Sequence, residues 1–288
     1  MKENSFESIN TLKVMGAILL FQVVSFGFFL LLGLQFRAYI SSQLLNDYFN
    51  IFMHASSLGI ILLFFKEKGI SFQKVMGPLN ILEERWNKWI VIKLLLMVCS
   101  YGFLLAILKL TLRFVSQEAF LEVLMEEGPS GGIIARPLMF VLSFTLAPIV
   151  EEVVFRGFLL NKWGEKIGIR KAIFWSSFLF SILHFQSFLP QFLGGLLYSL
   201  IYTKTGKLSI SIILHSLGNF ANGFLLFYLS NLEGETLTRE TAMQSIGEID
   251  RTLTIGTVVF IGTLLVTVFV LYKQSTELPQ GIPYHRNN

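Results

Sequence analysis

Residues 147–157 read Ala-Pro-Ile-Val-Glu-Glu-Val-Val-Phe-Arg-Gly, a run that sets three charged side chains inside a stretch that is otherwise apolar from about residue 136 to residue 160. A segment of ~20 apolar residues is long enough to cross the hydrocarbon core of a bilayer as a helix. A charged group at that depth costs roughly 2.5–3.5 kcal/mol even on the scale with the smallest penalty, so such residues persist mainly where function needs them. The run therefore predicts a transmembrane helix that carries a polar site.

The same apolar character extends along the whole chain of 288 residues, of which 53% are hydrophobic and 15% charged. Soluble domains contain about 25% charged residues. Because a spanning segment has to satisfy its own backbone hydrogen bonds, we expect helices, and the alternating pattern of an outer-membrane barrel is absent. The sequence predicts an all-α, polytopic transmembrane bundle of about eight spans in a single domain, residues 1–288. We place the spans at 12–34, 47–65, 89–112, 136–160, 171–187, 188–203, 208–230 and 252–272.

Charged residues between the predicted spans alternate in sign from loop to loop. Basic residues collect at 66–88, 162–171 and 204–207, whereas acidic residues collect at 118–127 and 233–250. Because Lys and Arg are enriched in cytoplasmic loops, this pattern predicts that both termini are cytoplasmic. We attribute the formal net charge of +4 to topology and to contact with anionic lipid headgroups, so we expect the bilayer as a partner and no nucleic acid.

The charged residues of the opening run differ in their surroundings. Pro148 removes a backbone donor and clashes with the preceding turn, so the helix should kink just ahead of the glutamates. Glu152 and Arg156 are four residues apart, on one helix face, and can form an ion pair. Glu151 points about 100° away from Glu152, which leaves it without a partner. Glu151 is therefore a candidate functional carboxylate, while the pair has either a structural or a supporting role.

Later apolar segments contain two histidines and an asparagine, His184, His215 and Asn219. A lone histidine in an apolar helix is more often a satisfied core residue, but two of them beside a glutamate pair indicate one shared pocket. In such a pocket a carboxylate and an imidazole can hold and deprotonate a water, while a second imidazole, an amide and a guanidinium stabilise the resulting oxyanion. We interpret His54 as a core or lining residue, and His285 lies in the tail.

Other catalytic arrangements lack the residues that they need. The chain has only two aspartates, Asp47 and Asp250, both near or in loops, which excludes a pair of intramembrane aspartates. It contains no His-Glu-x-x-His, and its Gly-x-Ser-x-Gly, at residues 128–132, falls in a loop that we interpret as a flexible turn. Cys99 is the only cysteine, so an internal disulfide and a cysteine-based zinc site are also excluded.

The order Glu-Glu-x-x-x-Arg, Phe-x-x-x-His and His-x-x-x-Asn resembles a known family, the CPBP intramembrane proteases. These include CAAX prenyl endopeptidases of the Ras-converting type and bacterial abortive-infection and bacteriocin-processing relatives. The resemblance covers about residues 135–225, a protease-like core, and the Phe-Arg-Gly after the glutamates adds to it. Residues 1–130 and 250–288 match only as hydrophobic spans.

The resemblance implies a role for each motif residue. Glu151 and His184 would activate the water, and His215 and Asn219 would form the oxyanion site. Glu152 and Arg156 would support that pocket. It also leaves two versions of the chemistry: a zinc ion held by Glu151, His184 and His215, or a metal-free glutamate mechanism, which we favour.

The sequence thus predicts a multi-pass intramembrane endopeptidase that cleaves peptides or proteins at the membrane. Two alternatives use the same polar cluster: a transporter, although no inverted repeat is visible, and a non-catalytic immunity or scaffold protein. Substrate identity, prenylation of the substrate and oligomeric state stay open. One conflict arises in this topology, because His184 lies 13 residues beyond Lys171, about 20 Å along a helix, whereas Glu151 is placed in the cytoplasmic half. The tail from Pro279 to Asn288 shows no pattern that would order it.

Overall fold

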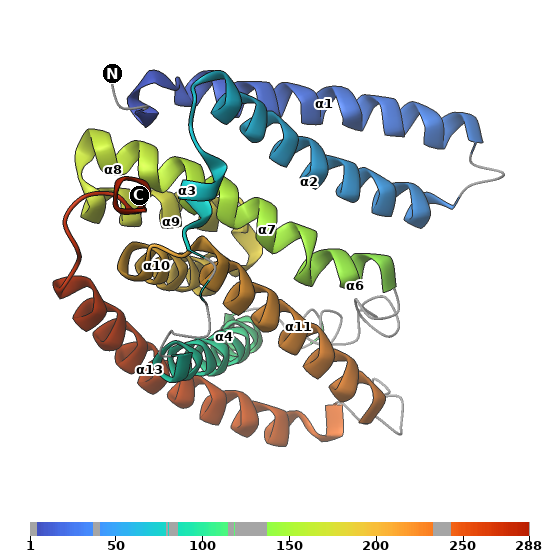
Figure 1. The fold of residues 1–288 in the computed structure, drawn as a ribbon. Coiled ribbons are helices and arrows are strands. Elements are labelled where there is room, and N and C mark those ends of the chain that lie inside the picture. Colours follow the sequence, from blue (N-terminus) through green and yellow to red (C-terminus); the bar gives the residue numbers. More distant parts are fainter. Residues whose placement is uncertain are drawn as a thin grey trace.

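The computed structural model describes residues 5–36, 41–78, 80, 86–114, 118, 137–232 and 243–287, without the side chains of residues 186 and 226–232. All regular structure in these ranges is helical, and the long helices run roughly alongside one another (Figure 1). The prediction of an all-α membrane bundle is confirmed. The acidic loops expected at 118–127 and 233–250 lie largely outside the described residues.

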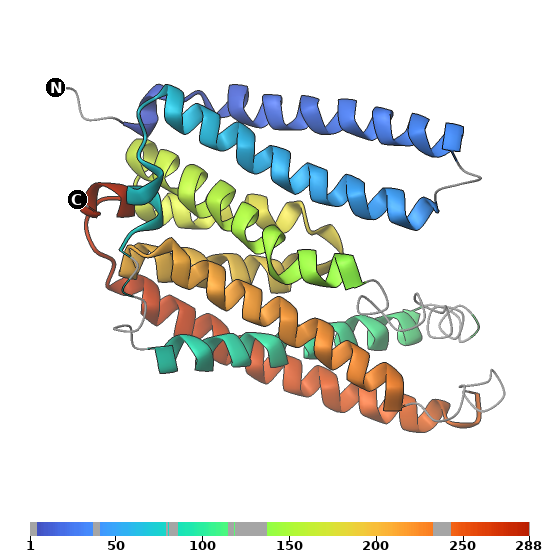
Figure 2. The same cartoon turned by 45° about the vertical axis from the view of Figure 1, so that its right-hand side comes forward.

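The helices follow one another in this order, with bounds in brackets: η1 (Phe6–Ser8), α1 (Thr11–Phe36), α2 (Ser42–Glu67), α3 (Phe72–Met76), α4 (Trp86–Phe114), α6 (Pro137–Phe144), α7 (Leu146–Glu152), η4 (Val153–Leu160), α8 (Asn161–Ile167), α9 (Ile169–Ile182), η5 (Phe185–Ser187), α10 (Phe188–Thr205), α11 (Leu208–Leu232), α13 (Ile246–Thr276) and α14 (Pro283–Arg286). The α1–α2 hairpin lies along one side of the bundle and the α4–α13 pair along another (Figures 1 and 2). The elements from α6 to α11 lie between them.

Six helical segments of the described residues are long and apolar enough to cross a membrane: Thr11–Phe36, Ser42–Glu67, Trp86–Phe114, Pro137–Ile167, Leu208–Leu225 and Ile246–Thr276. The two further spans that we expected, at 171–187 and 188–203, correspond to α9, of 14 residues, and α10, of 18 residues. Every residue of α10 from Leu193 to Thr203 except Leu196 is buried. Because its neighbours α9, α4 and α11 cover α10 with protein, this helix does not need the length or hydropathy of a lipid-facing span.

The segment from α6 to α8 is one long helix with two irregularities. It breaks at Thr145, three residues before Pro148, as expected from a proline ring that clashes with the carbonyl of the fourth residue before it. Beyond the glutamates, η4 is π-helical, a feature that often marks functional sites. The side-chain amide of Asn161 donates to the carbonyl oxygens of Arg156 at 3.2 Å and Gly157 at 2.8 Å. It thereby satisfies carbonyls at the point where the wider turn ends.

A glycine turn brings Glu151 and His184 to matching depths. Gly168, with φ +85°, closes the hairpin between α8 and α9, and a positive φ of this kind favours glycine. Glu151 precedes Gly168 by 17 residues and His184 follows it by 16, so antiparallel helices place both at the same level. The depth conflict noted in the sequence disappears, because both residues lie equally far from the turn.

Both ends of the described chain pack on the same end of the bundle (Figure 2). Glu165 of α8 accepts hydrogen bonds from Ser5 at 2.8 Å and from the backbone of Glu7 at 2.9 Å, and it contacts His285 at 2.9 Å. The expectation of an unordered tail is wrong. Tyr284 is buried against Phe6, and Asn287 donates to the carbonyl oxygen of Lys74 at 2.8 Å, because the tail satisfies polar groups that the helix ends leave open.

Candidate active site

The predicted polar residues come from four elements that meet in the centre of the bundle. Glu151 and Glu152 end α7, and Arg156 follows on η4. His184 stands in the turn between α9 and η5, where its φ of −114° and ψ of 48° are no longer helical. The remaining two predicted residues, His215 and Asn219, lie on α11.

A fully buried ion pair between Arg156 and Glu152 lies beneath the site and supports it. The guanidinium of Arg156 donates to Glu152 Oε1 at 3.1 Å, and neither side chain is exposed. Arg156 also donates to the carbonyl oxygen of Gly195 at 3.1 Å and lies 4.7 Å from the ring centroid of Phe180. A side chain at Gly195 would stand 2.9 Å from Cβ of Ser177, so α9 and α10 approach this closely only with glycine there. The pair is thus a well-enclosed support with little room to move.

His215 is oriented by contacts on its edge and on its face. Its Nδ1 lies 2.9 Å from Glu152 Oε1, and its Nε2 lies 3.6 Å from Glu151 Oε2. The ring of Tyr198 stacks on the imidazole with centroids 4.6 Å apart and an interplanar angle of 18°. Glu152 therefore sets the direction in which Nε2 points, toward Glu151.

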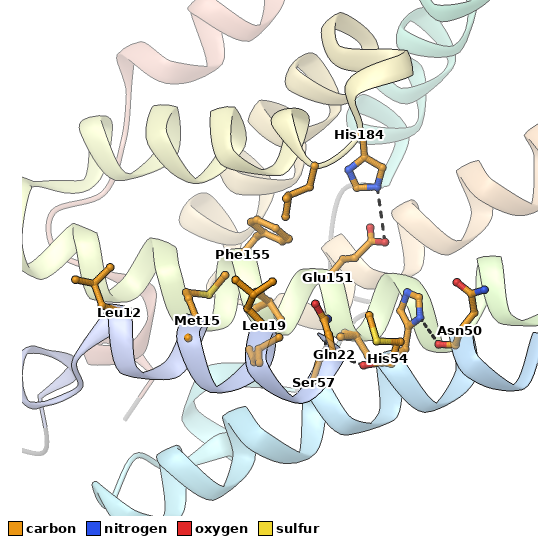
Figure 3. A pocket seen from close by; sticks show the side chains of 16 residues that line it. Leu12, Met15, Leu19, Gln22, Asn50, His54, Ser57, Glu151, Phe155 and His184 are labelled. Carbon is orange, nitrogen blue, oxygen red and sulfur yellow. Dashed lines mark hydrogen bonds and ion pairs between the residues drawn. The ribbon is translucent and has the colours of Figure 1, made fainter. Parts of the chain in front are cut away.

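His184 approaches Glu151 from the other side. Its Nδ1 lies 2.8 Å from the carbonyl oxygen of Phe180, and its Nε2 lies 3.9 Å from Glu151 Oε1, the contact drawn as a dashed line in Figure 3. An Nδ1 that faces a carbonyl or a carboxylate has to carry the proton, so in a neutral ring Nε2 is an acceptor. Glu151 and the two Nε2 atoms thus form a gap lined by acceptors, which a water molecule can fill by donating its two hydrogens.

Asn219 lies one turn beyond His215 and faces a small polar cavity. Its amide nitrogen donates to the carbonyl oxygen of Ser143 at 2.8 Å, which fixes the orientation of the amide and leaves a second N–H. A cavity of about 50 Å³ lies next to His215 and Asn219. It is also lined by Lys93, Ser100, Gln191, Tyr198 and Asn222, among others. A space of this size and polarity suits one or two water molecules.

A much larger groove opens on the opposite side of Glu151. Its volume is about 600 Å³, and it runs between the α1–α2 hairpin and the helices that carry Glu151 and His184. Figure 3 shows these two side chains on one wall and Gln22, Asn50 and His54 on the other. The rest of the lining is mostly apolar, with Leu12, Met15 and Phe155 among its members. The acceptor-lined gap is therefore part of the wall of an elongated, mainly apolar groove.

The donor atoms around Glu151 are of the types that zinc accepts, namely imidazole nitrogens and a carboxylate. Within the ranges that the structure describes, no group of three or more His, Cys, Asp or Glu side chains is arranged to hold a metal ion. The version of the chemistry that we favoured from the sequence uses protein groups and water only.

The motif analysis missed several residues of the site. Lys93 was detectable, because it is a charged residue inside the span expected at 89–112. Tyr198 and Gly195 carried no such signal, since a tyrosine or a glycine is ordinary in a membrane helix. Their roles follow only from the way α10 packs against α9 and α11.

The fold and the site together define a helical membrane protein with a Glu/His pocket, and comparison with known proteins shows what this chain is similar to. Residues 133–221, which include all six predicted site residues, match the family model of "Type II CAAX prenyl endopeptidase Rce1-like" proteins. The chain is also 35% identical over 121 residues to the "Membrane-embedded CAAX protease MroQ" of Staphylococcus aureus (strain USA300). That alignment covers 38% of this chain and 48% of the relative, so the chain spans about half the length of the curated relative that it matches. No solved structure matches significantly. These matches confirm the resemblance to the CPBP intramembrane proteases over the segment that carries the motifs.

Proposed function

We propose that this chain is an intramembrane endopeptidase that hydrolyses peptide bonds of membrane-associated peptides or proteins. The observation that carries the proposal is the position of Glu151. Its carboxylate faces Nε2 of His184 and Nε2 of His215 at 3.9 Å and 3.6 Å, in the wall of a groove of about 600 Å³. A half-buried carboxylate without a cationic partner at bonding distance is suited to accept a proton.

The water occupies the gap between Glu151 and His184. Glu151 takes one proton as the water oxygen attacks the carbonyl carbon of the scissile bond, and His184 accepts a hydrogen bond from the other. The tetrahedral intermediate then collapses: the C–N bond breaks, and the proton held by Glu151 passes to the leaving amine. The products are a new carboxyl terminus and a new amino terminus, and Glu151 is again a carboxylate.

His215 and Asn219 are the groups assigned to the oxyanion. Asn219 has one amide N–H free after its bond to Ser143. To donate from Nε2, His215 has to carry both ring protons, and the Glu152 carboxylate at Nδ1 stabilises that form. Arg156 in turn holds Glu152 in place through their ion pair. Asn219 is thus a donor held in place before substrate binds, and His215 becomes a second donor when its Nε2 takes up a proton.

The groove suits a substrate with an apolar flank. Leu12, Leu19 and Leu183 line it and are 83%, 62% and 63% exposed, so in a bilayer they would face lipid. An extended peptide that lies along them would expose its polar backbone to Gln22 and His54. Because this apolar lining would face lipid, such a peptide would reach the site from within the membrane.

The test is cleavage by the purified protein in detergent, with peptides that carry an apolar flank and with mass spectrometry of the products. Glu151→Gln keeps the shape and loses the proton acceptor, so cleavage should fall by about 10²–10⁴-fold. Cleavage should continue in a chelator, and activity that is lost there and restored by zinc would establish the metal version instead. Unchanged cleavage by Glu151→Gln would remove the proposed base. A wild-type protein that cleaves none of the peptides but carries protons in liposomes would support a transporter.

A further inference from the structure

Lys93 is the eighth residue of α4, a helix long and apolar enough to cross a membrane, and its side chain is half-buried. Its ammonium donates to the hydroxyl of Tyr198 at 2.6 Å and lies 5.2 Å from the centroid of that ring. Among the described residues, no carboxylate lies within ion-pairing distance of it. Lysine is seldom buried in this way without a functional reason, and none of the three motifs contains it.

The partner of Lys93 leads directly to the active site. The ring of Tyr198 stacks on the imidazole of His215, and the tyrosine is only 2% exposed. The edge of the same imidazole is held by Glu152. Tyr198, held by Lys93, thus constrains the tilt of the His215 ring. Glu152 sets the direction in which that ring points within its own plane.

Gly218 provides an independent sign that the path of Lys93 is built into the fold. A Cβ added at Gly218 would stand 2.2 Å from Cε and 2.4 Å from Nζ of Lys93. Gly218 lies on α11, three residues after His215, so the lysine crosses that helix where no side chain is present. Helix α11 therefore carries His215 and, at Gly218, leaves the space that the side chain of Lys93 occupies.

We infer that Lys93 is a positioning residue of the active site, which holds Tyr198 against His215 and so fixes the imidazole whose Nε2 faces Glu151. Its ammonium also brings a second cation, after Arg156, to a pocket that contains two carboxylates. The kinetic consequence of this inference rests on the proposed peptidase function, whereas its structural consequence does not.

The experiment compares Lys93→Leu, Gly218→Ala and the double variant with Lys109→Leu. Leucine ends at Cδ, and Cδ of Lys93 lies 3.7 Å from where the alanine methyl would stand, so this substitution removes both the ammonium and the clash. Lys109 is on the same helix and pairs with Asp250, which makes it a matched control. Because a misplacement of about 1 Å can cost 10²-fold, we expect kcat to fall about 10- to 100-fold in either single variant, with KM changed less than about twofold. The double variant should lose no more than Lys93→Leu alone, and Lys109→Leu should match the wild type.

A second readout is the NMR spectrum of protein labelled at the histidine ring carbons. The signal of His215 is identified as the one that is missing from the spectrum of His215→Gln. A displaced Tyr198 ring should move the His215 ring signal in Lys93→Leu and Gly218→Ala, whereas the signal should stay unchanged in Lys109→Leu. Tyr198→Phe keeps the ring but loses the hydroxyl, and it replaces Lys93→Leu if that variant does not fold. If the wild type cleaves peptides while Lys93→Leu keeps full kcat and an unmoved His215 signal, the inference is wrong and the proposed function stands. If the wild type is inactive but the signal moves, the proposed function fails and the positioning role stands.

Discussion

The N-terminal hairpin and the central helices bury very different shares of their surface. The most apolar windows of α1 and α2 are 11% and 17% buried, whereas those of Pro137–Ile167 and Leu208–Leu225 are 39% and 44% buried. The hairpin is held together largely by aromatic contacts such as Phe21–Phe52 and Phe29–Phe49. The central helices are joined by a chain of polar contacts that runs from Arg156 through Glu152 to His215.

This difference indicates that the centre holds the reacting groups in place, while the hairpin forms part of the substrate groove. Polar groups that hold one another in a fixed geometry are enclosed by protein, where charge-assisted hydrogen bonds are strongest. The hairpin contributes one wall of the large groove and meets the centre mainly through α2, which contacts α7 and η4. We therefore expect substitutions in the centre to change turnover or stability, and substitutions in the hairpin to change substrate binding.

The largest effect is expected at His184, which lies where the centre faces the groove. His184→Ala removes the acceptor that shares the water with Glu151, so kcat should fall by about 10²–10⁴-fold. Folding should change little, because the side chain is 31% exposed and its polar contact is with the backbone of its own helix. Steady-state kinetics and thermal unfolding in detergent measure both. A variant that unfolds readily would show that His184 is a core residue instead.

The next largest effect is expected on the free energy of unfolding, when the buried Arg156–Glu152 ion pair is broken. Arg156→Leu leaves the Glu152 carboxylate buried without its cation, and removing one partner of such a pair costs about 3–5 kcal/mol. The midpoint of thermal unfolding in detergent should therefore drop clearly. Arg170→Leu is the matched control, because Arg170 is exposed and makes one long bond to the carbonyl oxygen of Thr276. Equal midpoints for the two variants would contradict the view that the centre is held by its polar chain.

A smaller loss is expected at Asn219. Asn219→Ala removes one oxyanion donor, which lowers kcat by about 10²–10³-fold in comparable sites. Asn222→Ala, one turn further along α11 and on the same polar cavity, is the control and should stay close to the wild type. If both variants lose activity equally, the cavity acts as a whole and Asn219 has no special part in it.

The sequence was sufficient for most of the central region. Charged and imidazole side chains in apolar helices stand out against their background, and the Glu152–Arg156 pair, the break before Pro148 and the meeting of Glu151 with both histidines all followed from spacing. These features depend on residue type and local helix geometry, which a single sequence contains.

Other features depend on packing between helices that are distant in the sequence. The π-helical turn of η4, the stacking of Tyr198 on His215 and the docking of the tail through Tyr284 had no local signal. The segment of the buried helix α10 was expected to be one of the spans, because hydropathy does not distinguish a helix surrounded by protein from one surrounded by lipid. The groove beside the hairpin was likewise invisible, since it is a gap between surfaces and no pattern in the chain encodes it.

The smallest effect is expected in the hairpin, at His54. Its Nδ1 lies 2.8 Å from the carbonyl oxygen of Asn50, so in the neutral ring Nε2 is an acceptor, and the residue lines the groove opposite Glu151 (Figure 3). A single hydrogen bond of this kind contributes about 0.5–1.5 kcal/mol, so His54→Leu should raise KM about 2- to 10-fold and leave kcat within about twofold. His285→Leu makes the same replacement outside the groove and should leave KM unchanged. A loss of kcat in His54→Leu would place the hairpin within the catalytic apparatus, and the separation of tasks between the two regions would have to be abandoned. A raised KM at constant kcat would sharpen it, because the same change would then affect binding without touching the chemistry on the other wall.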